Sequence, residues 1–337
     1  MRLNLEAVVI PSLSVLVALS AATALLVAPA QAAPIPWPAG LPVYDHVVIV
    51  IEENKNYEEI IGSGSAPYIN GTLAAEGANL TRIFGEEHNS EGNYFWLLSG
   101  SNQGVGFVDG IPDSRRNPHY PFTAPNLPQE LIAAGRSFKG YSEDLPAIGD
   151  TTSRHDLYAR KHVPWISFAN IPHGARVEDS SHLRWTDFPS DYSRLPTVAV
   201  VVPNLINDMH DGPVAQSVPR GDAWLQKYLD GYYQWARTHN SLLILTFDEN
   251  ENPLHIHQLT DPASVEECRQ NRIPTLLAGA HVRHGEFSEG KGVTHVNLLR
   301  TLESMYGLEP CGGQQENALR AGIGAGTLIT DVFETVR

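Results

Sequence analysis

The sequence predicts an α/β fold, namely a doubly wound, mostly parallel sheet with helices on both faces. Continuous apolar runs rich in β-branched residues, as in TVAVVVPN, are typical of strands buried on both faces of a sheet. Segments with apolar residues at three- and four-residue spacing lie between these runs. Strands that alternate with helices in this way build doubly wound sheets.

The elements can be followed along the chain. His46 to Ile51, in HVVIVIEEN, is the first apolar run and predicts a strand. Asn126 to Ala134 has a proline near its start, and a glycine follows its last residue. These are typical of the first turn and of the C-terminal end of a helix, so the segment predicts a helix. The other predicted strands cover 198–202, 242–247 and 273–277, and the other predicted helices cover 224–235 and 296–306.

Residues 1–32 are typical of an export signal. A weakly positive start precedes an apolar run from Val15 to Val27, and Ala30-Gln31-Ala32 follows as a small-residue cleavage site. A membrane anchor is the alternative, but the run is shorter than the roughly 20 apolar residues that a spanning helix needs. We therefore expect no integral membrane span, cleavage after Ala32, a secreted or periplasmic location, and a single domain over residues 33–337.

The chain is strongly acidic, with a net charge of −15 at pH 7. Such a surface repels nucleic acid, so we expect no nucleic-acid partner. It also repels a small phosphorylated substrate unless the binding site is locally positive, and a bound cation would make it so. Nothing in the sequence indicates an oligomeric state. The two cysteines, Cys268 and Cys311, predict a disulfide in an exported protein.

Polar residues follow three of the predicted strands. Glu52-Glu53-Asn54 follows the first, Asn207 to Asp211 (NDMHD) follows the second, and Asp248-Glu249-Asn250 follows the third. One such group could simply cap the next helix. Three groups at the carboxyl ends of parallel strands, where ligands bind, favour a site for a divalent metal cation instead.

A candidate nucleophile, Ser90, lies in the predicted loop His88 to Tyr94 (HNSEGNY). A serine in a loop is ordinarily a turn residue, but a metal would lower the pKa of its hydroxyl and position it for attack on phosphorus. Asn93 is then a candidate for binding a phosphoryl oxygen through its amide.

Three of the 14 histidines are candidates for protonating a leaving group. His210 lies beside Asp211, His295 lies at the start of a predicted helix, and His88 is a third choice. Lys161 and Arg154 are candidate phosphate clamps, with ordinary surface charges as the equal alternative.

Taken together, these motifs resemble the bacterial phosphoesterases that include secreted acid phosphatases and C-type phospholipases, distant relatives of alkaline phosphatases. The resemblance covers nearly all of the chain after the signal. It is carried by HVVIVIEENKNYEEIIGSGSAPYINGTLAAEGA, NLPQELIAAGRSFKGYSEDLP, YARKHVPWISF, VPNLINDMHDG, GDAWLQKYL, LLILTFDENEN and THVNLLRTLESMYGL.

The resemblance implies an alkaline-phosphatase-like fold and a set of site residues. The metal ligands fall on Glu53, Asn54, Asp248 and Glu249, and the nucleophile falls on Ser90. The family's asparagine, three residues after the nucleophile, matches Asn93. Its histidine upstream of the Asp-Glu pair matches His210, and the downstream histidine of the wider superfamily matches His295.

The loop around Ser90 departs from the family pattern. Members of this branch usually have a sequence such as HPSLPNY, whereas this chain has HNSEGNY. Asn89 and Gly92 replace the two prolines, which predicts a more flexible loop, and Glu91 is expected to add a negative charge beside the attacking oxygen.

The resulting hypothesis is an exported, metal-dependent, acid-phosphatase-like phosphomonoesterase that works through a phosphoserine intermediate. The first alternative is a phosphodiesterase of the phospholipase C type, although phospholipases of this family tend to be longer. The second alternative is a secreted metal-binding protein that has lost catalysis, for which the altered loop around Ser90 is the best support.

Overall fold

The computed structural model describes residues 41–105, 110–251, 270–288 and 291–334, all within one compact unit, Pro34–Arg337. The predicted export signal lies outside the described residues, so it stays a prediction. Among the described residues, no helix combines the length and apolarity that crossing a bilayer requires. Cys311 is buried, but Cys268 lies outside the described residues, so their disulfide also stays a prediction.

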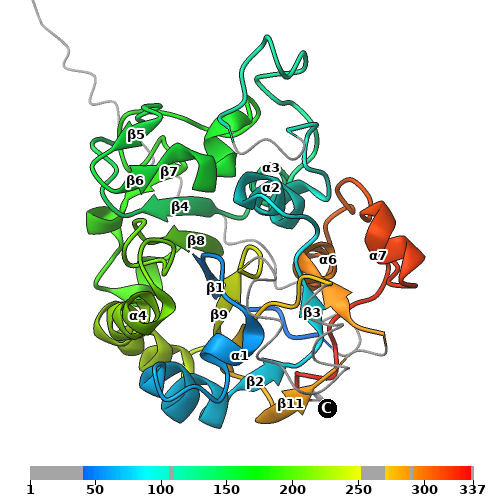
Figure 1. Ribbon diagram of the computed structural model, residues 1–337. Helices are drawn as coiled ribbons and strands as arrows, with labels where there is room; N and C mark the ends of the chain where they lie inside the picture. Colours follow the sequence, from blue (N-terminus) through cyan, green and yellow to red (C-terminus); the bar gives the residue numbers. More distant parts are fainter. Residues whose placement is uncertain (1–40, 106–109, 252–269, 289–290, 335–337) are drawn as a thin grey trace, which may run out of the picture. The chain divides into compact units, whose positions relative to one another are not determined.

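An eight-stranded sheet forms the centre of the unit, in the order β11-β2-β10-β9-β1-β8-β4-β7 (Figure 1). Its middle strands pair in parallel, as predicted, whereas β10 runs antiparallel to both β9 and β2. The strands are β1 (His46–Glu52), β2 (Ala78–Leu80), β4 (Phe138–Ser142), β7 (His182–Arg184), β8 (Val198–Val202), β9 (Ser241–Phe247), β10 (Thr275–Gly279) and β11 (Gly285–Phe287).

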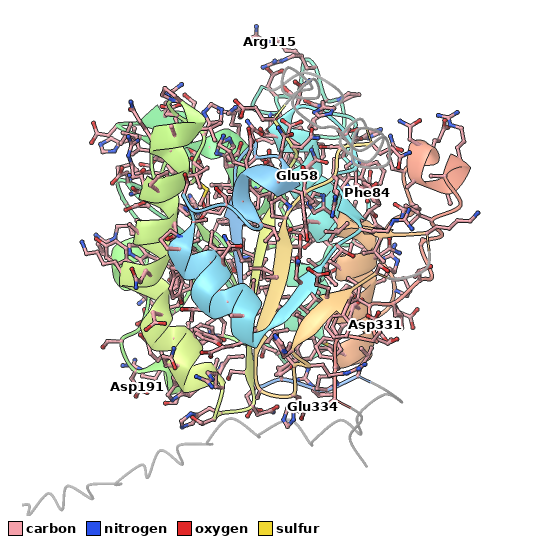
Figure 2. The ribbon with its side chains drawn as sticks, turned by 60° about the horizontal axis from the view of Figure 1, so that its bottom comes forward. Glu58, Phe84, Arg115, Asp191, Asp331 and Glu334 are labelled. Carbon is pink, nitrogen blue, oxygen red and sulfur yellow. The ribbon has the colours of Figure 1, made fainter. Side chains whose placement is uncertain are left out.

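Helices cover both faces of this sheet, and Figures 1 and 2 show α4 on one side and α6 on the other. Helix α4 contacts β9, β10 and α1, while α2, α3 and α6 contact one another. The helices are α1 (Tyr57–Ile60), α2 (Ser90–Ser99), α3 (Leu127–Ala133), α4 (Val214–Ala236), α6 (His295–Tyr306) and α7 (Glu316–Arg320). The predicted fold class, a mostly parallel sheet between helices, is confirmed.

Short elements complete the described chain. Two small sheets pair β3 (Ile83–Phe84) with β12 (Val293–Thr294), and β5 (Arg154–His155) with β6 (Tyr158–Ala159). The short helices are η1 (Ile69–Ala74), η2 (Arg160–His162), η3 (Pro164–Ser167), η4 (Trp185–Asp187) and η5 (Tyr192–Arg194).

Helix α4 begins ten residues earlier than the sequence pattern indicated, at Val214 rather than Trp224. The added turns contain Pro219 and Gly221, which are both poor helix formers, so these turns cannot be predicted from local helix propensity. Packing explains the glycine, because a Cβ at Gly221 would lie 2.4 Å from the Met209 side chain. This close approach holds the segment that carries Asp208 and His210 against α4.

The prediction of a loop over residues 88–94 is wrong from Ser90 onwards, since Ser90 is the first residue of α2. Serine, glycine and asparagine lower the helix propensity of this first turn. Burial outweighs that cost, because Tyr94, Phe95 and Leu98 of the same helix lie in the hydrophobic core. The serine therefore sits at a helix N-terminus, on a fixed element.

Candidate active site

The ends of β1 and β9 bring two pairs of polar residues together. The strands pair in parallel with Glu52 opposite Phe247, so Glu53-Asn54 and Asp248-Glu249 leave the sheet side by side. The Asp248 N–H donates to the Glu52 carbonyl, and the Asn54 N–H donates to Asp248 Oδ1 at 3.1 Å. Asn54 has a φ of +48°, a left-handed conformation that asparagine tolerates better than most residues.

The Asn54 amide faces a group of carboxylate oxygens. One of its terminal atoms lies 3.2–3.3 Å from both oxygens of Asp248 and from Glu249 Oε1. In one orientation the amide nitrogen donates to these carboxylates. In the other, the amide oxygen joins them as a further cation ligand, which suits a hard divalent cation.

Ser90 lies within reach of this group. Its hydroxyl donates to Glu53 Oε2 at 2.9 Å and approaches Glu249 Oε1 at 3.3 Å. The side chain is buried, and its position at the start of α2 adds the positive end of the helix dipole. An alkoxide formed at this oxygen would be stabilised by the dipole and by any cation that the carboxylates hold.

The acidic residues of the site are buried close to one another. Burial, and then Asp248 and Asp208, raise the pKa of Glu53 well above its usual value. Burial and then the Glu249 charge raise the pKa of Asp248 to about 7. Ionised carboxylates packed in this way repel one another in a medium of low polarity, so a bound cation would stabilise them.

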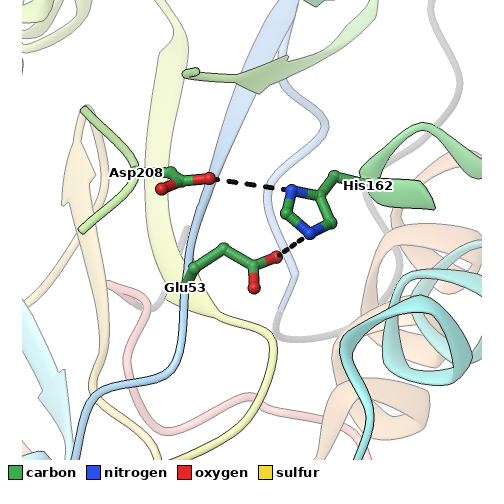
Figure 3. A group of neighbouring side chains, drawn as sticks. All are labelled: Glu53, His162 and Asp208. Atoms are coloured by element: carbon green, nitrogen blue, oxygen red, sulfur yellow. Dashed lines mark ion pairs between the residues drawn. The ribbon is translucent and has the colours of Figure 1, made fainter. Parts of the chain in front are cut away.

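His162 and Asp208 form a second group of potential ligands together with Glu53 (Figure 3). His162 Nε2 lies 3.2 Å from Glu53 Oε1, and His162 Nδ1 lies 3.6 Å from Asp208 Oδ2. All three side chains are buried, and ligand atoms from each lie within 4.8 Å of one another. Burial lowers the pKa of His162 well below its usual value, which leaves the neutral imidazole that binds metals.

The donor set fits a divalent cation. His162 Nε2 and Asp208 Oδ2 are buried without a hydrogen-bond partner among the residues that the structure describes. Orphaned polar atoms cost free energy unless a ligand satisfies them. Asp208 belongs to the polar residues that follow the second predicted strand. His162 comes from the short helix η2, and no sequence motif singles it out as a ligand.

Tyr94 connects the two groups. Its hydroxyl donates to Glu53 Oε1 at 2.5 Å, and its ring stacks on the His162 imidazole with centroids 5.3 Å apart and planes 5° apart. Since Tyr94 lies one helical turn after Ser90, helix α2 positions both the serine and the Glu53 carboxylate.

The loop before Ser90 holds Glu249. The backbone N–H of Asn89 donates to Glu249 Oε2 at 2.8 Å, and His88 Nδ1 lies 2.9 Å from the same oxygen. Asn89 has a φ of +92°. A proline there has no N–H and cannot adopt this angle, so the departure from the family pattern adds a contact to a candidate metal ligand.

Asn93 and Glu91 support the loop rather than face the site. The Asn93 amide accepts the N–H groups of Glu86 and Glu87 and donates to the Glu87 carbonyl at 2.6 Å. Binding a phosphoryl oxygen would require it to leave that carbonyl, so this role stays a prediction. Glu91 is buried and accepts the Gly110 N–H. The negative charge expected beside the attacking oxygen is therefore directed towards the backbone of Gly110.

Two of the three candidate acid histidines, His210 and His295, lie in different surroundings. His210 lines a cavity of about 270 Å³ together with Asn54, His88 and Glu249. Its Nδ1 pairs with Asp211 Oδ1 at 2.8 Å, which orients the ring.

His295 is buried at the start of α6, where its Nε2 lies 2.8 Å from the Phe247 carbonyl, and it is not among the described residues that line the cavity. Burial lowers its pKa to about 4. Its predicted role as an acid therefore stays a prediction, while its contact supports the residue before Asp248.

Lys55 is a cation of the cavity that the sequence patterns did not single out. It lines the cavity, is 1% exposed, and donates through Nζ to the Asn54 carbonyl at 2.8 Å. Of the two predicted phosphate clamps, Arg154 is exposed on β5, and the Lys161 charge opposes the rise in the pKa of Glu53 that burial causes.

Comparison with known proteins gives a consistent result. The model of the Phosphoesterase family matches residues 64–309. A phosphatidylinositol-3-phosphatase of Mycobacterium tuberculosis is 43% identical over 274 residues, which are 81% of each chain. A probable acid phosphatase of Kluyveromyces lactis is 30% identical over 60% of this chain, and the match spans about half (47%) of that relative.

Solved structures show the same fold at low identity. A protein of the alkaline phosphatase superfamily from Vibrio parahaemolyticus has a TM-score of 0.54 at 12% identity, with 81% of this chain and 69% of that chain covered. A lipoteichoic acid synthase from Listeria monocytogenes has a TM-score of 0.53 at 13% identity, with 88% and 78% covered. The predicted alkaline-phosphatase-like fold is confirmed.

Proposed function

Because the chain belongs to the Phosphoesterase family, whose members named above are phosphatases, and is thus a phosphoric-ester hydrolase, we propose that it is an exported, metal-dependent phosphomonoesterase with Ser90 as nucleophile. The observation that carries this proposal is the position of Ser90. Its hydroxyl lies at the start of α2, between carboxylates of Glu53 and Glu249 that come from two different segments.

Glu53, Asn54, Asp248 and Glu249 would hold a divalent cation, with His162 and Asp208 as further ligands next to Glu53. When bound, the cation would lower the pKa of the Ser90 hydroxyl and offset negative charge on the phosphoryl oxygens.

The proposed reaction is a two-step displacement. The Ser90 hydroxyl passes its proton to the Glu53 carboxylate, which it already contacts, and Oγ forms a bond to phosphorus, while the bond between phosphorus and the substrate's alcohol oxygen breaks. His210, oriented by Asp211, gives that alcohol a proton. Water then attacks the phosphoserine and gives one proton to His210, the bond between phosphorus and Ser90 Oγ breaks, phosphate leaves, and Ser90 takes its proton back from Glu53. Lys55, in the wall of the cavity, offsets the charge of the bound phosphate.

Two considerations support the finer parts of this proposal. The curated relatives named above are all phosphatases, which supports phosphomonoesters as the substrate class. The signal-like residues 1–32 support export and a secreted or periplasmic location.

The test is hydrolysis of p-nitrophenyl phosphate and bis-p-nitrophenyl phosphate by the purified protein from pH 5 to 9, with and without EDTA. We expect turnover of the monoester that EDTA abolishes and a divalent cation restores. Ser90→Ala should remove it, whereas Ser99→Ala, at the other end of α2, should not. A preference for the diester would favour the phospholipase C alternative. Metal binding without turnover of either ester would favour the metal-binding protein.

A further inference from the structure

A second cavity, of about 470 Å³, lies beside the one that is lined by Asn54, Glu249 and His210. His88 lines both cavities. The segment Gly85 to His88, which forms one wall of the larger cavity, leads directly into Asn89 and Ser90. A group joined through oxygen to a phosphorus atom at Ser90 can therefore extend past His88 into this second space, which has the size of a typical small-molecule site.

One wall of this cavity is apolar. Phe84 (labelled in Figure 2) packs with Ala318 and Ile323 in a small buried cluster that is separate from the main core. All three residues also line the cavity. An apolar wall of this kind fits the face of a ring rather than a short chain of polar atoms.

The rest of the lining is polar and acidic. Glu86 and Glu87 line the cavity, and among its described lining residues there is no lysine or arginine. Asn102 donates to both oxygens of Glu87 at 3.1 Å, which holds this carboxylate in place. Thr294 and Asn317 add hydrogen-bonding groups at other points of the wall. Hydroxyl groups of a ligand find acceptors here, while a carboxylate or second phosphate meets like charge when Glu86 and Glu87 are ionised. Burial raises the pKa of both carboxyls, for Glu86 to about 7, so this repulsion is strongest at alkaline pH.

We propose that this cavity binds the alcohol part of the phosphomonoester and selects neutral, hydroxyl-bearing rings over anionic ones. This inference rests on the proposed function and adds a substrate class to it. Ala321, exposed at the end of α7, lies in the cavity lining and offers a place to fill the space without disturbing the core.

The first test fills the cavity. Ala321→Trp should lower the ratio of kcat/KM for glucose 1-phosphate to kcat/KM for methyl phosphate by about tenfold, since a tenfold loss needs about 1.4 kcal/mol of binding. Leu319→Trp is the matched control, because Leu319 is exposed on the same helix and is not among the cavity's lining residues. It should leave the ratio within twofold.

The second test probes charge. The wild-type protein should prefer glucose 1-phosphate to glucuronic acid 1-phosphate by about tenfold, because like charges several ångströms apart in a partly buried site repel by one to a few kcal/mol. Glu87→Gln should reduce that preference at least about threefold. Glu309→Gln, an exposed carboxylate elsewhere, should not change it.

The outcomes separate the two proposals. If the wild-type protein hydrolyses neither methyl phosphate nor p-nitrophenyl phosphate, the proposed function fails. If it hydrolyses both, but Ala321→Trp and Leu319→Trp give the same substrate ratio, the cavity does not bind the alcohol. An unchanged preference in Glu87→Gln overturns the acidic wall as the source of selection.

Discussion

Two buried histidines in this molecule have similar burial but different surroundings. His182 accepts a hydrogen bond from Trp165 Nε1 at 3.0 Å and lies 3.4 Å from the Tyr158 hydroxyl. His162 lies between the carboxylates of Glu53 and Asp208, and its Nε2 has no hydrogen-bond partner among the described residues. Burial lowers the pKa of both imidazoles.

The difference lies in what satisfies each ring. Around His182 the neighbouring side chains supply hydrogen bonds, so the ring is part of the packed interior. Around His162 the neighbours are acidic oxygens that need a positive charge. A lowered pKa therefore does not by itself mark a functional histidine, whereas orphaned ligand atoms beside buried carboxylates indicate a cation site.

The largest expected effect is at Glu53, which contacts Ser90, Tyr94 and His162. Glu53→Gln should lower kcat/KM for p-nitrophenyl phosphate about a thousandfold, because several kcal/mol of charge stabilisation depend on the cation that Glu53 would hold. Steady-state kinetics with added metal would measure the loss.

Glu52→Gln is the matched control for that variant. Glu52 is also buried, and burial raises its pKa well above the usual value, so glutamine imitates the neutral acid. An equal loss of activity in both variants would contradict the assignment of Glu53 as the ligand.

A smaller effect is expected at Tyr94, which positions Glu53 and stacks on His162. Tyr94→Phe keeps the ring but removes the hydroxyl, so activity at limiting metal should fall about 10- to 100-fold, as for other residues that orient metal ligands. A saturating metal concentration should restore part of the lost activity. A loss that metal concentration does not change would mean that Tyr94 acts in another way.

Thermal unfolding should separate the two histidines. A cation at a hundredfold excess over its Kd stabilises the folded state by about 2.7 kcal/mol, so added metal should raise the Tm of the wild-type protein. His162→Gln should reduce that increase, while His182→Gln should lower the Tm without changing the increase. Equal responses to metal in both variants would mean that His162 is not a ligand.

The effect that is smallest, counted per pH unit, concerns acid stability. Burial lowers the pKa of His182 to about 3 in the folded protein, against about 6.5 when unfolded. Between these values the unfolded chain binds more protons, so the free energy of unfolding falls as the pH drops below about 6.5. His182→Gln should reduce this dependence by about 1.4 kcal/mol per pH unit between pH 6 and 4, measured by urea unfolding. An unchanged slope would contradict the neutral, buried state of His182.

The strands that carry the site could be predicted from the sequence because β1, β8 and β9 are continuous apolar runs. Acidic residues lie at the ends of β1 and β9, and Asp208 follows β8 after a short segment. The two edge strands, β11 and β7, are three residues long and have no such pattern. The predicted strand 273–277 is displaced by two residues from β10, because Ile273 is buried but comes before the pairing with β9 begins.

Tertiary packing decided the rest of the site. The first turn of α2 has weak helix propensity and is held by burial, so Ser90 could be picked as a candidate but not placed on a helix. His162 comes from a short helix between β6 and η3, far in sequence from the strand ends. Its role depends on Glu53 and Asp208, which only the fold brings to it.

The most direct test of the central claim is to look for the phosphoryl group on Ser90. A reaction with p-nitrophenyl phosphate would be quenched in acid during turnover, and the peptides would be examined by mass spectrometry. The account predicts one phosphoryl group on the peptide that contains Ser90, and its absence after EDTA treatment or in Ser90→Ala. Full turnover with no phosphorylated peptide, together with direct transfer of the phosphoryl group to water, would contradict it.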